Sequence, residues 1–219
     1  INRLLADQGQ SLPCDLPLAD AGATIGGAVA AGVSGPGRFR YGGLRDFLLG
    51  VELATGDGRL VRLGSSVVQN AAGFDFPKLL VGSVGRFGVL TEVTLKVFPH
   101  PASYRTVVFE TASRQEALRL MLRLAATPLD LDRLDVVAGR EVWAQVGGNA
   151  DAVAARADRL LTHADVPTRQ LAGDEEAVAW DAANLFAWAP AEHGVVKIAV
   201  TPSALPDIAA ALDPFPIRI

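Results

Sequence analysis

The sequence has little of what several large classes of protein require. Its single cysteine, Cys14, excludes an internal disulfide and a zinc site built from several cysteines. No run approaches the roughly 18–20 apolar residues of a membrane span, and no signal peptide is visible. We therefore expect a protein of the reducing cytoplasm with no transmembrane segment. The 20 Lys and Arg residues are fewer than the 24 Asp and Glu residues, which leaves no electrostatic footprint for nucleic acid.

The familiar catalytic signatures are missing as well. The chain has no Gly-x-Gly-x-x-Gly motif after a strand, no Gly-x4-Gly-Lys-[Ser/Thr] loop, no His-Glu-x-x-His and no Gly-x-Ser-x-Gly. The three histidines are far apart and are expected to be structural or surface residues: His100, His163 and His193. Glu52 and Glu92 are interpreted as solvated structural charges. We therefore nominate no catalytic residue, no general base and no metal ligand.

Glycine is plentiful but unevenly placed. Of 22 glycines, 17 lie in residues 1–101 and five in residues 102–219. Glycine is used where the backbone needs positive φ or a close approach, so the first half is expected to be rich in both. Half of all residues are apolar, which makes disorder improbable on composition. We predict two domains, residues 1–101 and 102–219, with the boundary near Pro99-His100-Pro101.

The first half shows helix, hairpin and strand signals. Residues 25–32 are mostly small, which suits a helix packed closely against another backbone or a ligand. Residues 55–58 (Thr-Gly-Asp-Gly) predict a hairpin turn between two strands. Residues 89–98 alternate, with Thr91 and Val93 on one side and Glu92 on the other, which predicts a strand with one wet face.

The second half predicts a ferredoxin-like α+β sandwich. A strand at 104–110 precedes a helix capped by Ser113 and Glu116. A hairpin over 134–146, a second helix and a strand at 168–171 complete the order β-α-β-β-α-β. The remaining elements expected are a helix at 175–186, a strand at 195–200 and a last helix at 205–212.

Three glycine segments stand out, at residues 23–28, 37–46 and 82–91. Glycines let backbone N–H groups reach a polyanion, and successive N–H groups can form an anion-binding nest. A helix that begins near Thr24 would add its positive end. Two interpretations stay open on the glycines alone: loops that bind a ligand, or a compact fold that needs glycine turns.

The strings themselves resemble a known family. They are ATIGGAVAAG (23–32), SGP (34–36), YGGLRDFLLGV (41–51), QNAAGFD (69–75), KLLVGS (78–83) and GVLTEV (88–93). In this order and spacing, residues 21–101 resemble the flavin-binding region of the vanillyl-alcohol-oxidase-type (PCMH) FAD family. Within that family the likeness is to the FAD-binding subunits of glycolate oxidase. The resemblance implies an α+β fold, in which a PCMH-type subdomain with helices and a mixed or antiparallel sheet precedes a ferredoxin-like cap on the substrate side.

The resemblance also implies a cofactor, FAD, and residues that bind it. In the family, one loop lies along the FAD, a following segment lies on the flavin side, and the backbone of a strand-entry loop faces the cofactor. The matching positions are Thr24, Ile25, Gly26 and Gly27 for the first, Tyr41 and Gly42 for the second, and Gly85, Gly88, Val89 and Thr91 for the third.

The implied activity is oxidation of glycolate, a 2-hydroxy acid, to glyoxylate. The implied partners are a second flavoprotein subunit and an iron–sulfur subunit of a glycolate oxidase complex that passes electrons to a membrane acceptor. Any association with the inner face of the membrane would then come through the complex.

The chain departs from the family pattern in two places. Arg86 and Phe87 are bulky where the family often has a small residue and then leucine. Nothing before Asp20 matches the family's Gly-rich pyrophosphate loop, and residues 1–20 resemble only the helix and strand that close that subdomain. FAD would be absent from this chain if that subdomain is truly missing. Two alternatives therefore stand beside the FAD-binding subunit: a flavin-free scaffold or assembly subunit of the same complex, and a complete enzyme acting alone on another hydroxy acid.

Overall fold

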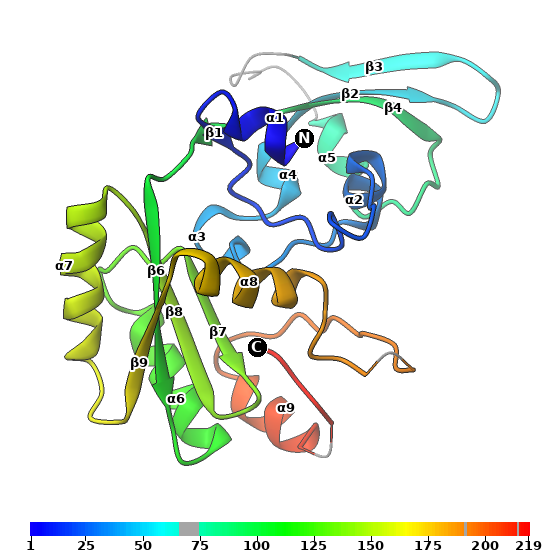
Figure 1. Cartoon of the computed structure of the whole chain (residues 1–219). Helices are drawn as coiled ribbons and strands as arrows, with labels where there is room; N and C mark the ends of the chain where they lie inside the picture. The colour runs from blue at the N-terminus through cyan, green and yellow to red at the C-terminus, as the bar shows by residue number, and fades with distance from the viewer. Residues whose placement is uncertain (66–74, 191, 214) are drawn as a thin grey trace. The chain divides into compact units, whose positions relative to one another are not determined.

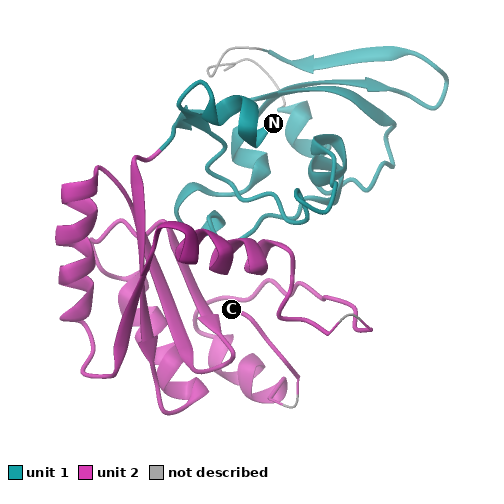
Figure 2. Cartoon of the chain, in the orientation of Figure 1, with its two compact units in different colours: residues 1–100 teal, residues 101–219 magenta. Residues whose placement is uncertain are grey.

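The structure is a computed structural model that describes residues 1–65, 75–190, 192–213 and 215–219 (Figure 1). The chain forms two compact units, Ile1–His100 and Pro101–Ile219 (Figure 2). Each unit has its own hydrophobic core, so each is described by itself. Among the described residues, no helix has both the length and the apolar character that a bilayer crossing requires.

Unit 1 is built on a three-stranded antiparallel sheet in the order β3-β2-β4. Its strands are β2 (Leu48–Ala54), β3 (Leu60–Gly64) and β4 (Val89–Leu95). The turn expected between β2 and β3 forms, with the Thr55 N–H donating to the Arg59 carbonyl at 2.9 Å and Gly58 at φ 80°. A second, two-stranded sheet pairs β1 (Gln10–Ser11) with β5 (Phe98–Pro99).

In the described part of unit 1, five short helices accompany these strands: α1 (Asn2–Ala6), α2 (Ile25–Ala31), α3 (Arg38–Tyr41), α4 (Leu44–Phe47) and α5 (Phe76–Leu79). Figure 1 shows α2, α4 and α5 on the same side of the three-stranded sheet. The buried side chains Val51 and Leu53 of β2 point to that side and pack with Val29 and Phe47. Alternation along β2 places Glu52 on the opposite, open face.

A β-bulge interrupts the pairing of β2 with β4. Glu52 pairs with Glu92 and Leu53 pairs with Leu90, so Thr91 is the extra residue. The Thr91 hydroxyl donates to a Glu52 carboxylate oxygen at 3.0 Å, on the open face, whereas Val93 packs against the core. The predicted alternation, with Thr91 and Val93 on one side, was therefore wrong at Thr91, because the bulge shifts the register there.

Unit 2 has a four-stranded antiparallel sheet in the order β7-β8-β6-β9. The elements are β6 (Ser103–Glu110), α6 (Arg114–Ala125), β7 (Arg133–Val137), β8 (Glu141–Gly148), α7 (Ala150–Leu161) and β9 (Thr168–Ala172). This is the β-α-β-β-α-β order predicted, with the strand arrangement of a ferredoxin-like sandwich. The predicted cap of α6 also forms, because the Ser113 hydroxyl accepts the Glu116 N–H at 3.2 Å.

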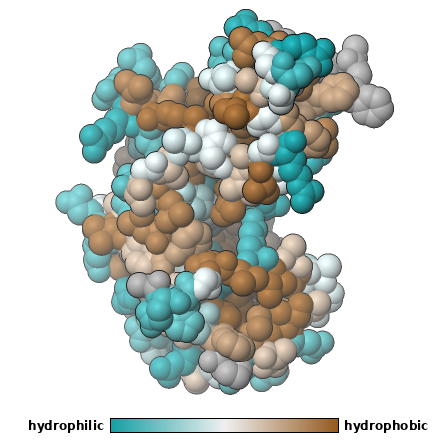
Figure 3. All heavy atoms as spheres, turned by 90° about the vertical axis from the view of Figure 1, so that its right-hand side faces the viewer, coloured by the Kyte–Doolittle hydropathy of each residue, from teal (hydrophilic) through white to brown (hydrophobic). Residues whose placement is uncertain are grey.

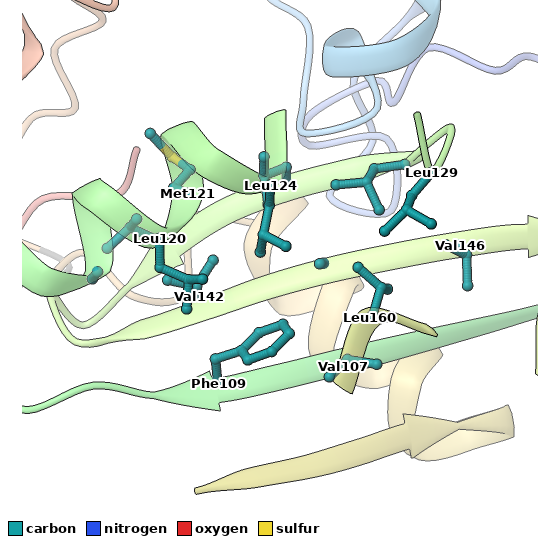
Figure 4. Packing of buried hydrophobic residues seen from close by; sticks show 14 of the residues in the cluster. Val107, Phe109, Leu120, Met121, Leu124, Leu129, Val142, Val146 and Leu160 are labelled. Carbon is teal, nitrogen blue, oxygen red and sulfur yellow. The ribbon is translucent and has the colours of Figure 1, made fainter. Parts of the chain in front are cut away.

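Both faces of this sheet are covered. On one face α6 and α7 pack Leu124 and Leu160 against Phe109 and Val142 (Figure 4). The helix α9 (Leu205–Ala211) adds Leu205 and Ala209 to the same core. On the other face α8 (Gly173–Asn184) packs Trp180 edge-on against Trp143, with ring centroids 5.6 Å apart.

A carboxylate is buried beneath α8. Glu176 is 3% exposed, and its Oε1 accepts from the Thr106 hydroxyl at 2.6 Å and from the Gln145 amide at 3.0 Å. The Trp180 indole N–H donates to the same Thr106 oxygen at 2.9 Å. Burial is the largest influence on this group and raises the pKa of Glu176, against the lowering effect of its two hydrogen bonds and of Arg133 and Arg105.

One predicted strand does not form. Residues 195–200 belong to no sheet among the described residues, and Val196 is 80% exposed. Hydrophobic side chains gather on the part of unit 2 that faces the viewer in Figure 3. The segment has the β-branched composition of a strand, but composition cannot supply the neighbouring strand that a ladder of hydrogen bonds requires.

Candidate functional site

The start of α2 presents backbone donors. Thr24 has extended backbone angles, and its Oγ1 accepts the Gly27 N–H at 3.0 Å, which makes it the N-cap of the helix. Within the described part of the chain, the N–H groups of Ile25 and Gly26 have no hydrogen-bond acceptor. These two donors lie at the positive end of the helix, so they could bind an anion together with the Thr24 hydroxyl, which keeps its own hydrogen to donate.

The end of α2 is bound by the third glycine segment. The Gly82 N–H donates to the Val29 carbonyl at 3.0 Å, and the Val84 N–H donates to the Ala30 carbonyl at 2.9 Å. A Cβ on Gly32 would lie 2.9 Å from the Gly82 backbone nitrogen and Cα, so neither backbone could come this close with a side chain between them. The small residues of α2 thus serve a close approach of two backbones, one of the two roles that the sequence left open.

The first and third segments also meet at β4. Gly26 lies against Leu90, where a Cβ on Gly26 would be 3.7 Å from the Leu90 Cβ. Gly88 has φ 145°, and a Cβ on it would overlap the Ala54 carbonyl oxygen of β2. By contrast, Gly82 and Gly85 have positive φ and open space where a side chain would stand. In the third segment, the fold therefore requires Gly88, whereas Gly82 and Gly85 leave space that a ligand could occupy.

Exposed apolar side chains flank these loops. Leu60, Ala54 and Val89 pair across the three strands, so they form one row on the open face of the sheet. Leu60 is 64% exposed and Val89 is 70% exposed. Phe87 is also exposed, which places its bulky side chain outside the contact between the third segment and α2. Arg86 is exposed in the same way.

The second glycine segment is held by other contacts. Tyr41 packs against Phe98 with ring centroids 6.3 Å apart. Gly42 has φ 86°, and a Cβ on it would overlap the Asp46 carboxylate. That carboxylate accepts the Gly43 N–H at 2.8 Å and caps α4. The fold therefore accounts for Gly42 without a cofactor, and the structure joins the first and third segments more directly than the second.

Two ionisable groups near the segments, Glu52 and Cys14, have shifted pKa values. Arg62 lies 2.7 Å from Glu52, and the hydrogen bonds from Arg62 and then from Thr91 lower the pKa of Glu52. A carboxylate held ionised in this way is a poor general base near neutral pH. Burial raises the pKa of Cys14 to about 12, so its thiol stays protonated and unreactive.

Some features of this site escaped sequence reasoning. The contact of Gly32 with Gly82 joins positions fifty residues apart, and no local pattern indicates it. The cap of α4 does have a local signal, because Gly43-Leu-Arg-Asp46 has the spacing of an N-cap and its N3 carboxylate. The motif at residues 69–75 lies largely outside the described residues. The described residues contain no group of three His, Cys, Asp or Glu side chains that could hold a metal ion.

The first part of the chain is similar to a known family. Residues 1–64 match the family described as FAD binding domain. The chain is 38% identical over 160 residues to glycolate oxidase subunit GlcE of Escherichia coli, covering 73% of this chain and 45% of that protein. It is 31% identical over 139 residues to D-2-hydroxyglutarate dehydrogenase of Xanthomonas citri, covering 61% of this chain and 29% of the relative.

The structure comparison agrees in fold. Alkyldihydroxyacetonephosphate synthase superimposes with a TM-score of 0.62 at 18% identity, over 81% of this chain and 38% of that one. The α+β fold class predicted from the sequence is confirmed. The chain spans less than half the length of these relatives.

Proposed function

Because residues 1–64 match the family described as FAD binding domain, we propose that this chain is the FAD-binding component of a glycolate oxidase complex. The reaction proposed is oxidation of glycolate to glyoxylate. The observation that carries the proposal is the match of residues 1–64 to that family. The Thr24 hydroxyl and the N–H groups of Ile25 and Gly26 lie inside the matched residues.

The donor set suits a cofactor that carries phosphates. Backbone N–H groups and a hydroxyl at a helix start bind phosphate oxygens without a lysine. Gly82 and Gly85 leave open space beside the same helix, so a ligand could approach the loop backbone closely. When bound, FAD supplies the two-electron oxidation of the CH–OH group. The residues proposed to hold it are Thr24, Ile25, Gly26, Gly27, Tyr41, Gly42, Gly85, Gly88, Val89 and Thr91.

The chain's own residues act here by binding and positioning rather than by proton transfer. Glu52 is committed to Arg62 and Thr91, and Asp46 caps α4. Neither carboxylate is therefore free to take the hydroxyl proton of a substrate. The base for glycolate oxidation is accordingly proposed to come from outside the residues discussed above.

The partners proposed are the other subunits of the complex. The names of two relatives support a multi-subunit enzyme: glycolate oxidase subunit GlcE, and glycolate oxidase subunit GlcD of Bacillus subtilis, which is 34% identical over 85 residues. We propose that this chain assembles with a second flavoprotein subunit and an iron–sulfur subunit, the latter on the family resemblance alone. In that setting the ferredoxin-like unit 2 is proposed to be the cap on the substrate side.

The test is FAD titration followed by calorimetry and by the flavin absorption band, with a matched pair of variants. Gly26→Glu places a negative charge at the free N–H groups, where a carboxylate suits the helix N-terminus and stability should hold. We expect it to weaken FAD binding at least tenfold by repulsion of the phosphates. Gly56→Glu makes the same change in the exposed hairpin turn and should leave binding unchanged.

Two outcomes would contradict the proposal. Equal affinity of both variants for FAD would remove the α2 start from the site. A wild-type chain that binds no FAD but still captures the partner subunits would instead support the flavin-free scaffold.

A further inference from the structure

Residues 217–219, called the tail segment here, run along the edge strand β7. The Val136 N–H donates to the Ile219 backbone oxygen at 2.6 Å, and the Ile219 N–H donates to the Val136 carbonyl at 3.3 Å. Two hydrogen bonds exchanged between one pair of residues are the pattern of an antiparallel ladder. β7 is the outermost strand on this side of the sheet, so this pairing covers an edge that would otherwise be open.

The side chains of the same three residues alternate between the two faces of the sheet. Ile217 and Ile219 pack against the core on the α6 and α7 side, the side that Val136 also faces. Arg218 points to the opposite face. This alternation has the period of two that defines a strand, and paired residues of a ladder share a face, as Val136 and Ile219 do.

On the α8 face, Arg218 is held by three neighbours. Its Nε lies 2.5 Å from the Asp135 carboxylate, and its guanidinium lies 5.6 Å from the Trp143 ring and 5.5 Å from the Trp180 ring. The side chain is 12% exposed. Since Asp135 belongs to β7, Trp143 to β8 and Trp180 to α8, this one side chain joins the tail segment to three elements.

We propose that the edge of β7 is a binding site for an extended Ile-Arg-Ile segment, and that residues 217–219 occupy it as a fifth strand. The isoleucines fill the apolar side, and the arginine is selected by Asp135 and the two tryptophan faces. An unpaired strand edge is a template for association with other chains. The tail segment therefore protects the β7 edge and couples it to α8.

The test measures amide hydrogen exchange of Val136 in the full chain, because its acceptor is Ile219 itself. Arg218→Ala should accelerate this exchange at least tenfold, and Ile219→Pro, which removes the return donor, should also accelerate it. Arg218→Lys should fall between, since an ammonium keeps the charge but not the planar stacking.

The matched control is Arg169→Ala. Its guanidinium lies 6.0 Å from the Trp143 ring but belongs to β9 and is 42% exposed, so Val136 should exchange as in the wild type. Unchanged exchange at Phe109 and Val142 would show that the variants remain folded. The proposal is overturned if Val136 stays equally protected in Arg218→Ala and Ile219→Pro.

Discussion

Unit 1 and unit 2 use their sheets in opposite ways. The sheet of unit 2 is covered on both faces, by α6 and α7 on one side and α8 on the other. The three-stranded sheet of unit 1 packs its helices on one side and leaves a face that carries Glu52, Arg62 and the apolar row with Leu60 and Val89. Unit 2 is therefore organised around side-chain packing and unit 1 around the close approach of backbones.

Glycine usage follows the same division. In unit 1 the glycines at 32, 42 and 88 sit where an added Cβ would meet backbone or a carboxylate at close range. Those at 82 and 85 face open space. The helix α2, which takes part in this close approach, also leaves N–H groups exposed at its start. Exposed N–H groups at a helix start are what phosphate binding requires.

The largest expected loss of stability comes from removing an aromatic side chain from the core of unit 2. Phe109 is fully buried between β6 and the helices, so Phe109→Ala should cost about 3–5 kcal/mol of the free energy of unfolding. The three tryptophans are all in unit 2, so denaturation followed by tryptophan fluorescence reports this unit. Phe215→Ala, at an exposed position of unit 2, is the control and should change stability by less than about 0.5 kcal/mol. Equal effects would refute the packing role assigned to Phe109.

A methyl group added at Gly88 should lower the stability of unit 1 and leave that of unit 2 unchanged. Gly88→Ala introduces a clash with the Ala54 carbonyl at positive φ, so we expect a loss on the order of 2–4 kcal/mol. The transition should shift when followed by far-UV circular dichroism, while the tryptophan signal of unit 2 stays in place. Gly85→Ala has positive φ but open space, and should cost about 1 kcal/mol. A shift of both signals together would mean that the units do not unfold separately.

The cap of α2 should contribute a smaller amount. Thr24→Ala removes the oxygen that accepts the Gly27 N–H and should cost about 1 kcal/mol. Thr24→Ser keeps that oxygen and should behave as the wild type. Thermal unfolding followed by far-UV circular dichroism measures both. If Thr24→Ala is also neutral, then α2 depends on its contacts with Gly82 and Val84 rather than on its cap.

The smallest expected effect is the change in the stability of unit 2 with pH. It is small because burial raises the pKa of Glu176 while its hydrogen bonds and two arginines lower it. A carboxyl whose pKa is raised by folding stabilises the fold fully below its unfolded pKa of about 4.3, and this contribution is lost as pH rises through the folded pKa. Stability relative to Glu176→Gln should therefore fall as pH rises through that window. Denaturation at a series of pH values measures it, with the exposed Glu175→Gln as control. A pH profile that Glu176→Gln leaves unchanged would contradict the burial effect.

Local signals in the sequence predicted much of the fold. The helix start near Thr24, the cap at Ser113, the Asp57-Gly58 turn and the order of elements in unit 2 all depend on residues within a few positions of one another. For the candidate site, the strings at 23–32 and 88–93 marked the segments that meet in space. Their roles toward FAD stay a prediction, because they concern a ligand rather than the chain.

The sequence alone indicates where helices, turns and glycine segments lie, since these follow from backbone freedom and side-chain periodicity. The partners that each segment meets become visible in the tertiary structure. It places Gly32 against Gly82, Thr91 in a bulge beside Glu52 and Ile219 along Val136, and it leaves residues 195–200 outside any sheet of the described residues. The physical reason is that a close contact or a strand pairing needs a second segment, and its identity is not encoded in the composition of the first.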